Sequence, residues 1–243
     1  AQTHMGKLWV FIDKDGLYKI DLSSFKIEDH YKPLPEYDDS SLRAFHVDKK
    51  GNIWLGTING LYILNPSSRE LSLYKHSGTD PFSLPNNSIW EIYEDRQDNV
   101  WIGTYSGTLS YVNVNENHAF RTYHTQNSGL NYAPASAFAE EQDYIWIGTE
   151  GYLFQYFPST GQMKQTEAFH NNSIKSLALD GNGDLLAGTD NGLYVYHNDV
   201  TPLQHIIHDS RNIQSLTNNI IWNIFADQEH NIWLGTDYGI SLS

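Results

Sequence analysis

Aromatic and basic residues recur at one position of this sequence. The position follows the residue that opens a predicted strand in each of five repeats, and it holds Arg43, Trp90, Ala135, Lys175 and Trp222. Because an indole, a guanidinium and a methyl group all occur there, packing does not dictate the choice. Indole rings stack on the apolar faces of sugar rings, while Arg and Lys bind hydroxyls or carboxylates. These residue types indicate a ligand-binding site for a glycan.

Asn59, Tyr105 and Tyr238 are weaker candidates for the same ligand-binding site, because each follows a Gly-Thr pair that we expect to end on the same rim. The linkers 75–88, 124–133 and 205–219 form a second possible recognition surface, since loops on a rigid scaffold often carry binding. The alternative interpretation is structural. In it, Trp90 and Trp222 fill gaps between repeats, and Arg43 and Lys175 are merely solvated.

The residues with catalytic or metal-binding chemistry form no recognisable pattern. The 11 histidines are scattered without the spacing of a zinc site, and we interpret His46 as a packed or rim histidine. Asp180, Asn182 and Asp184 resemble the start of a calcium loop, but its later glutamate is missing. We therefore predict no catalytic residue, no metal and no cofactor. An acid pair brought together by folding, as in glycosidases, is the alternative that the sequence leaves open.

Composition limits the possible partners. The 243 residues include 15 basic and 29 acidic ones, a net charge of −14, which opposes binding to nucleic acid or to an anionic membrane. The absence of cysteine excludes disulfides and thiolate chemistry. No apolar stretch approaches the ~20 residues of a membrane span. We expect any export signal to lie upstream of this chain.

A repeat of about 45 residues organises the sequence. Its signature is a Gly-Thr pair at Gly56-Thr57, Gly103-Thr104, Gly148-Thr149, Gly188-Thr189 and Gly235-Thr236. Two residues before each of these glycines stand Trp54, Trp101, Trp146, Leu186 and Trp233, and six residues earlier stand the acids Asp48, Asp95, Glu140, Asp180 and Asp227. A second glycine closes the motif at Gly60, Gly107, Gly151, Gly192 and Gly239.

Each repeat predicts four short antiparallel strands. The segments are rich in Ile, Val, Tyr, Trp and Thr and are bounded by turn residues. Four strands per repeat are typical of a β-propeller blade. We predict an all-β, single partial β-propeller domain over residues 1–243, with repeats at about 6–41, 42–88, 89–133, 134–173, 174–220 and 221–243. Four blades would be complete and one at each end partial, as part of a seven-bladed ring.

The segments GNIWLGTINGLYILNP, DNVWIGTYSGTLSYVN and HNIWLGTDYGISLS resemble the two-component regulator propeller repeat. The segments SLPNNSIWEIYED and SLTNNIIWNIFAD are similar to its linker and first strand. The resemblance implies the periplasmic sensor region of a hybrid two-component histidine kinase. Relatives of that kind carry a neighbouring propeller, an immunoglobulin-like domain, a membrane helix, a kinase, a receiver and a DNA-binding domain, none of which is recognised in this chain.

The resemblance implies a non-enzymatic, periplasmic sensor module that responds to oligosaccharides from polysaccharide breakdown. Its expected partners are an oligosaccharide, the neighbouring propeller or immunoglobulin-like domain, and a second copy in a homodimer. We expect no contact with nucleic acid or membrane. Two alternatives remain: a carbohydrate-active propeller enzyme, which is a glycosidase or a lyase, and a protein-interaction scaffold.

Overall fold

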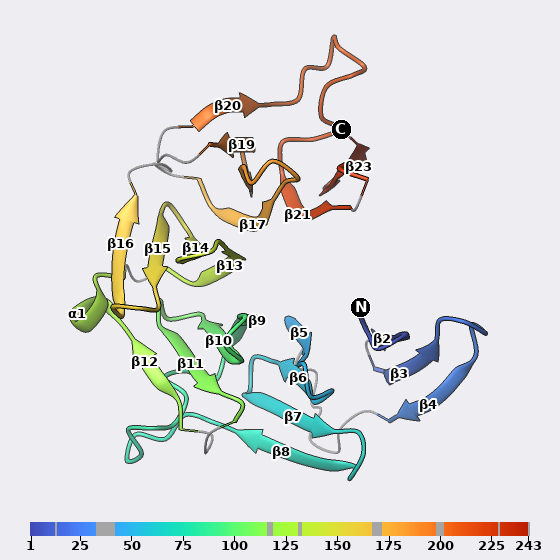
Figure 1. Cartoon of the computed structure of the whole chain (residues 1–243), viewed down its shortest axis with the longest axis vertical. Helices are drawn as coiled ribbons and strands as arrows, with labels where there is room; N and C mark the ends of the chain where they lie inside the picture. The colour runs from blue at the N-terminus through green and yellow to red at the C-terminus, as the bar shows by residue number, and fades with distance from the viewer. Residues whose placement is uncertain are drawn as a thin grey trace. The chain divides into compact units, whose positions relative to one another are not determined.

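Antiparallel sheets make up the fold of the computed structural model, and each sheet is formed by consecutive strands of the chain (Figure 1). The structure describes residues 1–12, 14–32, 42–115, 119–130, 133–166, 172–197, 202–227 and 229–242. The chain divides into two compact units, Ala1–Thr122 and Tyr123–Ser243. Within the described residues, no helix is long and apolar enough to cross a membrane.

The strands of the first unit form sheets of four strands in chain order. They are β1 (Gln2–His4), β2 (Lys7–Ile12), β3 (Gly16–Asp21) and β4 (Ile27–Tyr31); β5 (Ala44–Val47), β6 (Ile53–Gly56), β7 (Leu61–Asn65) and β8 (Glu70–Tyr74); and β9 (Ile89–Glu94), β10 (Asn99–Thr104), β11 (Leu109–Asn113) and β12 (Arg121–Tyr123). The last of these strands ends at the first residue of the second unit.

The second unit repeats the arrangement after a short helix, α1 (Thr125–Ser128). Its strands are β13 (Ala135–Glu140), β14 (Ile145–Thr149), β15 (Leu153–Phe157) and β16 (Gln162–Thr166); β17 (Ile174–Leu179), β18 (Leu185–Thr189), β19 (Gly192–Tyr196) and β20 (Pro202–Ile206); and β21 (Ile221–Ala226), β22 (Ile232–Thr236) and β23 (Gly239–Leu242). The short turns of the repeat allow only antiparallel neighbours, which gives each sheet its meander order.

A buried aspartate ties the turn between the first two strands of a sheet to the tryptophan of the second strand. In the β9–β12 sheet, Asp95 accepts hydrogen bonds from the backbone and side chain of Asn99 and from the indole Nε1 of Trp101, at 2.8–2.9 Å. The same Asp-Asn-Trp clasp recurs twice, in the sets Asp48, Asn52, Trp54 and Asp227, Asn231, Trp233. Hydrogen bonds from Trp233 and Asn231 hold the pKa of Asp227 at about 2, well below its usual value.

Two of the five sheets that carry the Gly-Thr motif lack the complete clasp. The turn after β13 is one residue shorter than the turn after β9. The backbone amide of Glu141 donates to the carbonyl of Tyr144, as that of Asp95 donates to Asn99. Glu141 therefore takes the place of Asp95, and not Glu140 as the spacing of the repeat indicated. The buried Nε1 of Trp146 then has no hydrogen-bond partner among the described residues. In the β17–β20 sheet Leu186 replaces the indole, and Asp180 accepts the backbone amides of Asn182 and Asp184 as an ordinary turn residue. This is the turn that resembled a calcium loop.

The glycine before three of the recurring threonines allows adjacent sheets to approach closely. A methyl group built on Gly56, Gly148 or Gly188 would lie 2.5–2.7 Å from Cγ2 of the isoleucine that opens the next sheet, namely Ile89, Ile174 or Ile221. None of these glycines has a positive φ, so close packing is the reason for glycine. The second glycine of the motif serves the turn, since Gly60, Gly107, Gly151, Gly192 and Gly239 all have a positive φ.

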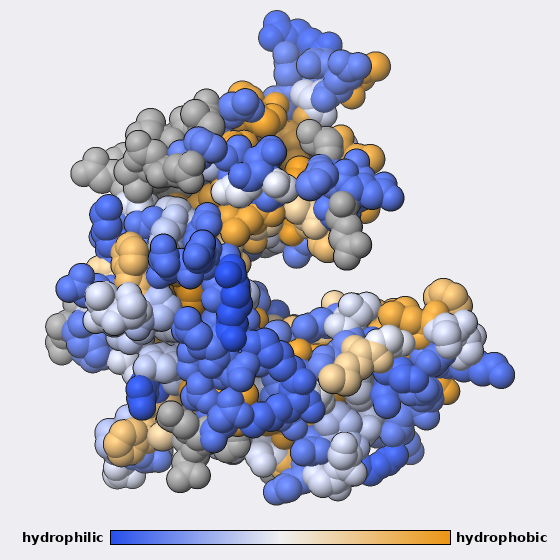
Figure 2. Space-filling model, viewed as in Figure 1, coloured by the Kyte–Doolittle hydropathy of each residue, from blue (hydrophilic) through white to orange (hydrophobic). Residues whose placement is uncertain are grey.

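In the last sheet, which no following sheet covers, the tryptophan of the motif is exposed to solvent. Trp233 is 38% exposed, whereas Trp54 and Trp101 are each 1% exposed. The nearest atom to a methyl group on Gly235 is 3.7 Å away, and it belongs to Asn223 of the same sheet. Phe225, Ile240 and Leu242 are exposed as well. In the other unit, hydrophobic side chains reach the surface over the sheet of β1–β4, where Phe25 and Ile27 are exposed (Figure 2).

The predicted all-β fold of four-stranded antiparallel blades is confirmed, but the predicted seven-bladed arrangement is wrong. The described residues form six blades, not four complete and two partial blades of a seven-bladed arrangement: the first five sheets have four strands and the last has three. The first sheet is complete because Gln2–His4 supply its innermost strand, with Gln2 opposite Trp9. The following turn is a tight one at Met5 and Gly6, both with positive φ, and it lacks the acid that marks the other turns.

Changing Gly148 to Ala tests the close approach. The added methyl would clash with Ile174, so we expect a loss of about 1–3 kcal/mol in the free energy of unfolding, measured by urea denaturation. In the matched Gly235→Ala change the added methyl makes only an ordinary van der Waals contact with Asn223, so it should leave stability within about 0.5 kcal/mol. Equal effects of the two changes would contradict this role of the glycine.

Changing Asp95 to Ala tests the clasp. The substitution removes the acceptor of the Trp101 indole and of Asn99 in a buried site, so we expect a loss of about 2–4 kcal/mol, seen as a lower Tm. Asp180→Ala is the control, because its turn binds no indole and should cost roughly half as much or less. A smaller loss at Asp95 than at Asp180 would show that the clasp adds nothing.

Candidate functional site

The predicted ligand-binding position lies at a β-bulge for Trp90, Lys175 and Trp222, whereas Arg43 directly precedes β5, which pairs regularly with β6. In the pairing of β9 with β10, Ile89 lies opposite Thr104 and Glu91 opposite Gly103, so that Trp90 is left out of the ladder. Lys175 and Trp222 are left out in the same way in their own sheets. A bulge bends the strand and turns the extra side chain away from the regular alternation. Backbone geometry therefore releases these residues from core packing.

In the first unit, Arg43 and Trp90 come together with Tyr105. The guanidinium carbon of Arg43 lies 4.8 Å from the centroid of the Trp90 ring, a cation–π contact. Arg43 also donates a hydrogen bond from Nη1 to the hydroxyl of Ser88 at 3.2 Å. The ring of Tyr105 is tilted toward Trp90, with centroids 6.0 Å apart. We call these four residues the Trp90 cluster.

In the second unit, Lys175 and Trp222 form the corresponding pair. The Lys175 ammonium lies 4.4 Å from the centroid of the Trp222 ring. The indole Nε1 of Trp222 donates a hydrogen bond to Asp237, which directly follows the recurring threonine, as Tyr105 does in its own repeat. We call Lys175, Trp222 and Asp237 the Trp222 cluster. In both clusters the cation comes from one sheet and the indole from the next.

Two predicted residues stay outside these clusters. The backbone amides of Asn59 and Tyr238 donate to the hydroxyls of Thr57 and Thr236 within their own turns, and both side chains are exposed. No recorded contact joins either side chain to an indole or a cation among the described residues. The linkers 124–133 and 205–219 belong to the second unit and 75–88 to the first; residues 131–132 lie outside the described residues.

Sequence reasoning missed Ser88 and Asp237. The signal for Asp237 was present, because it occupies the position of Tyr105 relative to the recurring Gly-Thr pair. Sequence alignment also placed Ala135 at the variable position, but in the β13–β14 pairing it is Ser136 that leaves the ladder. Ser136 donates to the backbone oxygen of Ile174 and so serves packing.

The two clusters offer a ligand aromatic surface beside hydrogen-bond donors. Trp90 is 37% exposed and Trp222 is 54% exposed, although one face of each ring carries its cation. The remaining ring surface can stack on an apolar face, and the cation can donate to hydroxyl or carboxylate oxygens. The Trp222 cluster contains both a positive charge, on Lys175, and a negative charge, on Asp237. In the described part of the chain, no carboxylate pairs with Arg43.

Two partly buried acids, Glu91 and Glu94, lie on the same strand as Trp90. Glu94 accepts hydrogen bonds from His46 Nε2 at 3.2 Å and from the backbone amide of Lys49 at 3.0 Å, so that His46 is a packed residue between two sheets. Burial raises the pKa of Glu91 to about 7. Among the residues that the structure describes, no group of three or more His, Asp or Glu side chains is arranged to hold a metal ion.

A family model described as the two-component regulator propeller matches residues 83–106 and 215–238. Each segment runs through a linker, an innermost strand and the Gly-Thr turn, and so includes Trp90 and Tyr105 or Trp222, Asp237 and Tyr238. A comparison with curated proteins finds no match.

Solved structures include close relatives. The extracellular domain of the putative hybrid two-component system BT4673 from B. thetaiotaomicron is 52% identical, with a TM-score of 0.82 over 98% of this chain and 31% of that chain. A second structure of the BT4673 extracellular domain is 51% identical, with a TM-score of 0.79 over 97% of this chain and 32% of that chain. The chain thus spans about a third of the length of these structures.

More distant structures share the fold alone. The extracellular domain of the putative hybrid two-component system BT3049 from B. thetaiotaomicron is 22% identical, with a TM-score of 0.69 over 100% of this chain and 38% of that chain. Virginiamycin B lyase from Staphylococcus aureus is 13% identical, with a TM-score of 0.62 over 85% of this chain and 71% of that chain. The repeats matched by the family model and the 52% identity to an extracellular domain show that this chain belongs to the two-component regulator propeller family.

Proposed function

We propose that this chain is a non-enzymatic ligand-sensing propeller segment of a hybrid two-component system, placed in the periplasm. The identity to the BT4673 extracellular domain supports the sensor role and the extracytoplasmic location. The observation that carries the ligand-binding part is the repetition of the cation–indole pair in both units. The ligand that fits these clusters is an oligosaccharide released from a polysaccharide.

The clusters favour a sugar because they combine an exposed aromatic surface, on which a sugar ring can stack, with hydrogen-bond donors beside it, to which sugar hydroxyls can bind. The Trp90 cluster holds two exposed rings, and its cation keeps several N–H groups besides the one given to Ser88. Each cluster, within its own unit, offers such a surface to a sugar ring.

Signalling follows from a difference in affinity. A bound ligand shifts a receptor between two arrangements only if it binds one arrangement more tightly. The partners that we propose for this step are the neighbouring propeller or immunoglobulin-like domain and a second copy of the full receptor. In each cluster, adjacent sheets contribute the cation and the indole, so a ligand that contacts both groups would favour one spacing of those sheets.

A second candidate function is catalysis, and Glu91 is the observation that favours it. A carboxyl group with a pKa of about 7 suits a general acid at neutral pH. Glycosidases need a second carboxylate at a defined distance, and the His46–Glu94 pair is engaged within the fold. The sensor function is therefore preferred, and an assay for product release from polysaccharides separates it from the enzyme.

Binding is tested by calorimetry of this chain against a panel of neutral and acidic oligosaccharides. We expect saturable binding without turnover. Trp90→Ala and Trp222→Ala should each weaken binding about tenfold, because an aromatic contact contributes roughly 1 kcal/mol beyond its buried area.

Tyr238→Ala is the control, since Tyr238 is exposed and lies outside both clusters. If both Trp variants bind the ligand as tightly as the original chain, the clusters are not the binding site. Silence across the whole panel from a folded chain would favour a protein-interaction scaffold.

The pH dependence of stability tests the environment of Glu91. Its pKa in the folded protein is raised from 4.5 to about 7, so folding opposes its ionisation, and the folded state loses stability as pH rises from about 4.5 through 7. Glu91→Gln removes that penalty. We expect the variant to have a higher Tm than the original chain at pH 8 and a similar Tm at pH 4. A constant difference across this range would contradict the raised pKa.

A further inference from the structure

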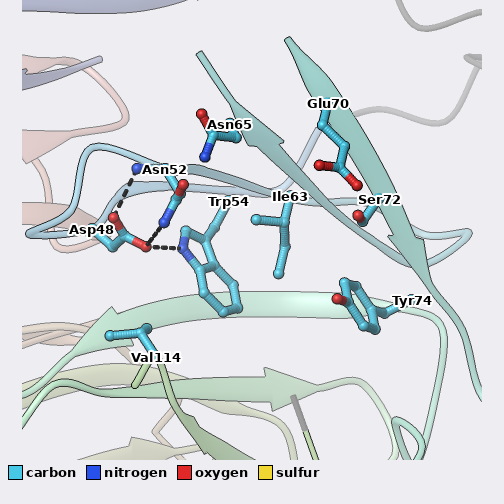
Figure 3. Close-up of a pocket in the computed structure, with 9 residues that line it drawn as sticks. All are labelled: Asp48, Asn52, Trp54, Ile63, Asn65, Glu70, Ser72, Tyr74 and Val114. Atoms are coloured by element: carbon cyan, nitrogen blue, oxygen red, sulfur yellow. Dashed lines mark hydrogen bonds between the residues drawn. The ribbon is translucent and has the colours of Figure 1, made fainter. Parts of the chain in front are cut away.

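A pocket of about 290 Å³ opens in the first unit, away from the Trp90 cluster (Figure 3). Its wall is one face of the β5–β8 sheet, on which Trp54, Ile63 and Ser72 lie opposite one another on successive strands. Asn65 and Glu70 form the next row of the same face. Val114, which follows β11, closes the other side. The volume is near the lower end of the range for small-molecule sites.

The pocket exists because a small side chain replaces a ring. In the β9–β12 sheet, Tyr111 lies opposite Trp101 and covers it, with ring centroids 4.8 Å apart. In the β5–β8 sheet the residue opposite Trp54 is Ile63, which is much smaller than tyrosine. The space that a phenol ring fills in one sheet is therefore open in the other.

The polar groups of the pocket divide into engaged and available ones. Asp48 is fully engaged by Asn52 and by the indole of Trp54, as the dashed lines of Figure 3 mark. The Glu70 carboxylate accepts no hydrogen bond, and the amide nitrogen of Asn65 donates none, among the described residues. Figure 3 shows both side chains on the same wall as the Ser72 hydroxyl.

The charge and the mixture of groups select the ligand. Two carboxylates and no Lys or Arg line the pocket, which disfavours an anion. A simple cation would satisfy Glu70 but would leave the Asn65 donor unpaired. Hydroxyl groups both donate and accept, so adjacent hydroxyls can serve Glu70, Asn65 and Ser72 together.

We infer that this pocket binds one neutral sugar residue, at a place distinct from the Trp90 and Trp222 clusters. The inference rests on the proposed sugar-binding function and adds a second site with its own selectivity. The Trp90 cluster accepts an acidic sugar through Arg43, while the pocket excludes one through Glu70.

The indole N–H signals of the chain distinguish the sites in a nitrogen–proton NMR spectrum. The seven tryptophans are assigned by single Trp→Phe changes. The chain is titrated separately with methyl glucoside and with glucuronate, which differ in charge on a similar ring, and with the oligosaccharides of the panel. We expect methyl glucoside to shift the Trp54 signal in a saturable way, because Trp54 lines the pocket, and glucuronate to shift it at least tenfold more weakly.

Two variants tie the signal to the pocket. Ile63→Tyr places in the pocket the side chain that already lies opposite the indole in the neighbouring sheet, and it should abolish the Trp54 response. Glu70→Gln, at an exposed position, should weaken the response at least tenfold without unfolding the chain. Tyr238→Ala is the control and should leave the response unchanged, because Tyr238 lies outside the pocket and outside both clusters.

The outcomes separate this inference from the proposed function. Shifts confined to the Trp90 and Trp222 signals would overturn the pocket site and support binding at the clusters. A Trp54 response that survives both pocket variants, or that glucuronate produces equally well, would also overturn it. A response of Trp54 alone would support binding in the pocket and contradict binding at the clusters. No response to any sugar would overturn both the pocket site and the proposed sugar-binding function.

Discussion

The structure depends on how closely one sheet can approach the next. Three isoleucines, each opening a sheet, project a methyl group onto a glycine of the preceding sheet, where no side chain would fit. This contact brings the backbones together and excludes water from the tryptophans beside it, since interior packing leaves few gaps. Where no following sheet is present, as at Gly235, the tryptophan of the motif is exposed. The recurring Trp and Gly are therefore one packing device.

The Asp-Asn-Trp clasp makes that packing device rigid. A buried indole needs an acceptor for its N–H, and a buried carboxylate needs donors, and the clasp satisfies both within a single turn. Its loss in the β13–β16 sheet leaves the Trp146 N–H without a described partner, while Tyr144 packs edge-on against the ring. The fold tolerates this exception because the hydrophobic contacts of the indole remain.

A rigid scaffold with one irregular position allows variation in function. At the β-bulges of the innermost strands β9, β13, β17 and β21, a residue leaves the ladder and its side chain is released from the regular alternation. The Trp90 cluster, the Trp222 cluster and Ser136 are three uses of this position, two of them exposed to solvent and one engaged in packing. The pocket beside Trp54 shows variation of another kind, because it follows from the exchange of a tyrosine for an isoleucine within a regular strand.

The sequence by itself determined the repeat, the four-stranded blades and the family, because alternating apolar residues, turn glycines and the Gly-Thr pair act locally and recur in register. It also singled out the position of Arg43, Trp90, Lys175 and Trp222, since unlike residues at equivalent places show that packing is relaxed. Tertiary structure alone decided that each cation lies over an indole of the next sheet, that Asp237 binds Trp222, and that a pocket opens beside Ile63. These contacts join residues a whole strand or a whole repeat apart, and their geometry depends on bulges and on turn lengths that a one-residue difference changes. The shortened turn after β13 and the complete first sheet escaped sequence analysis for that reason.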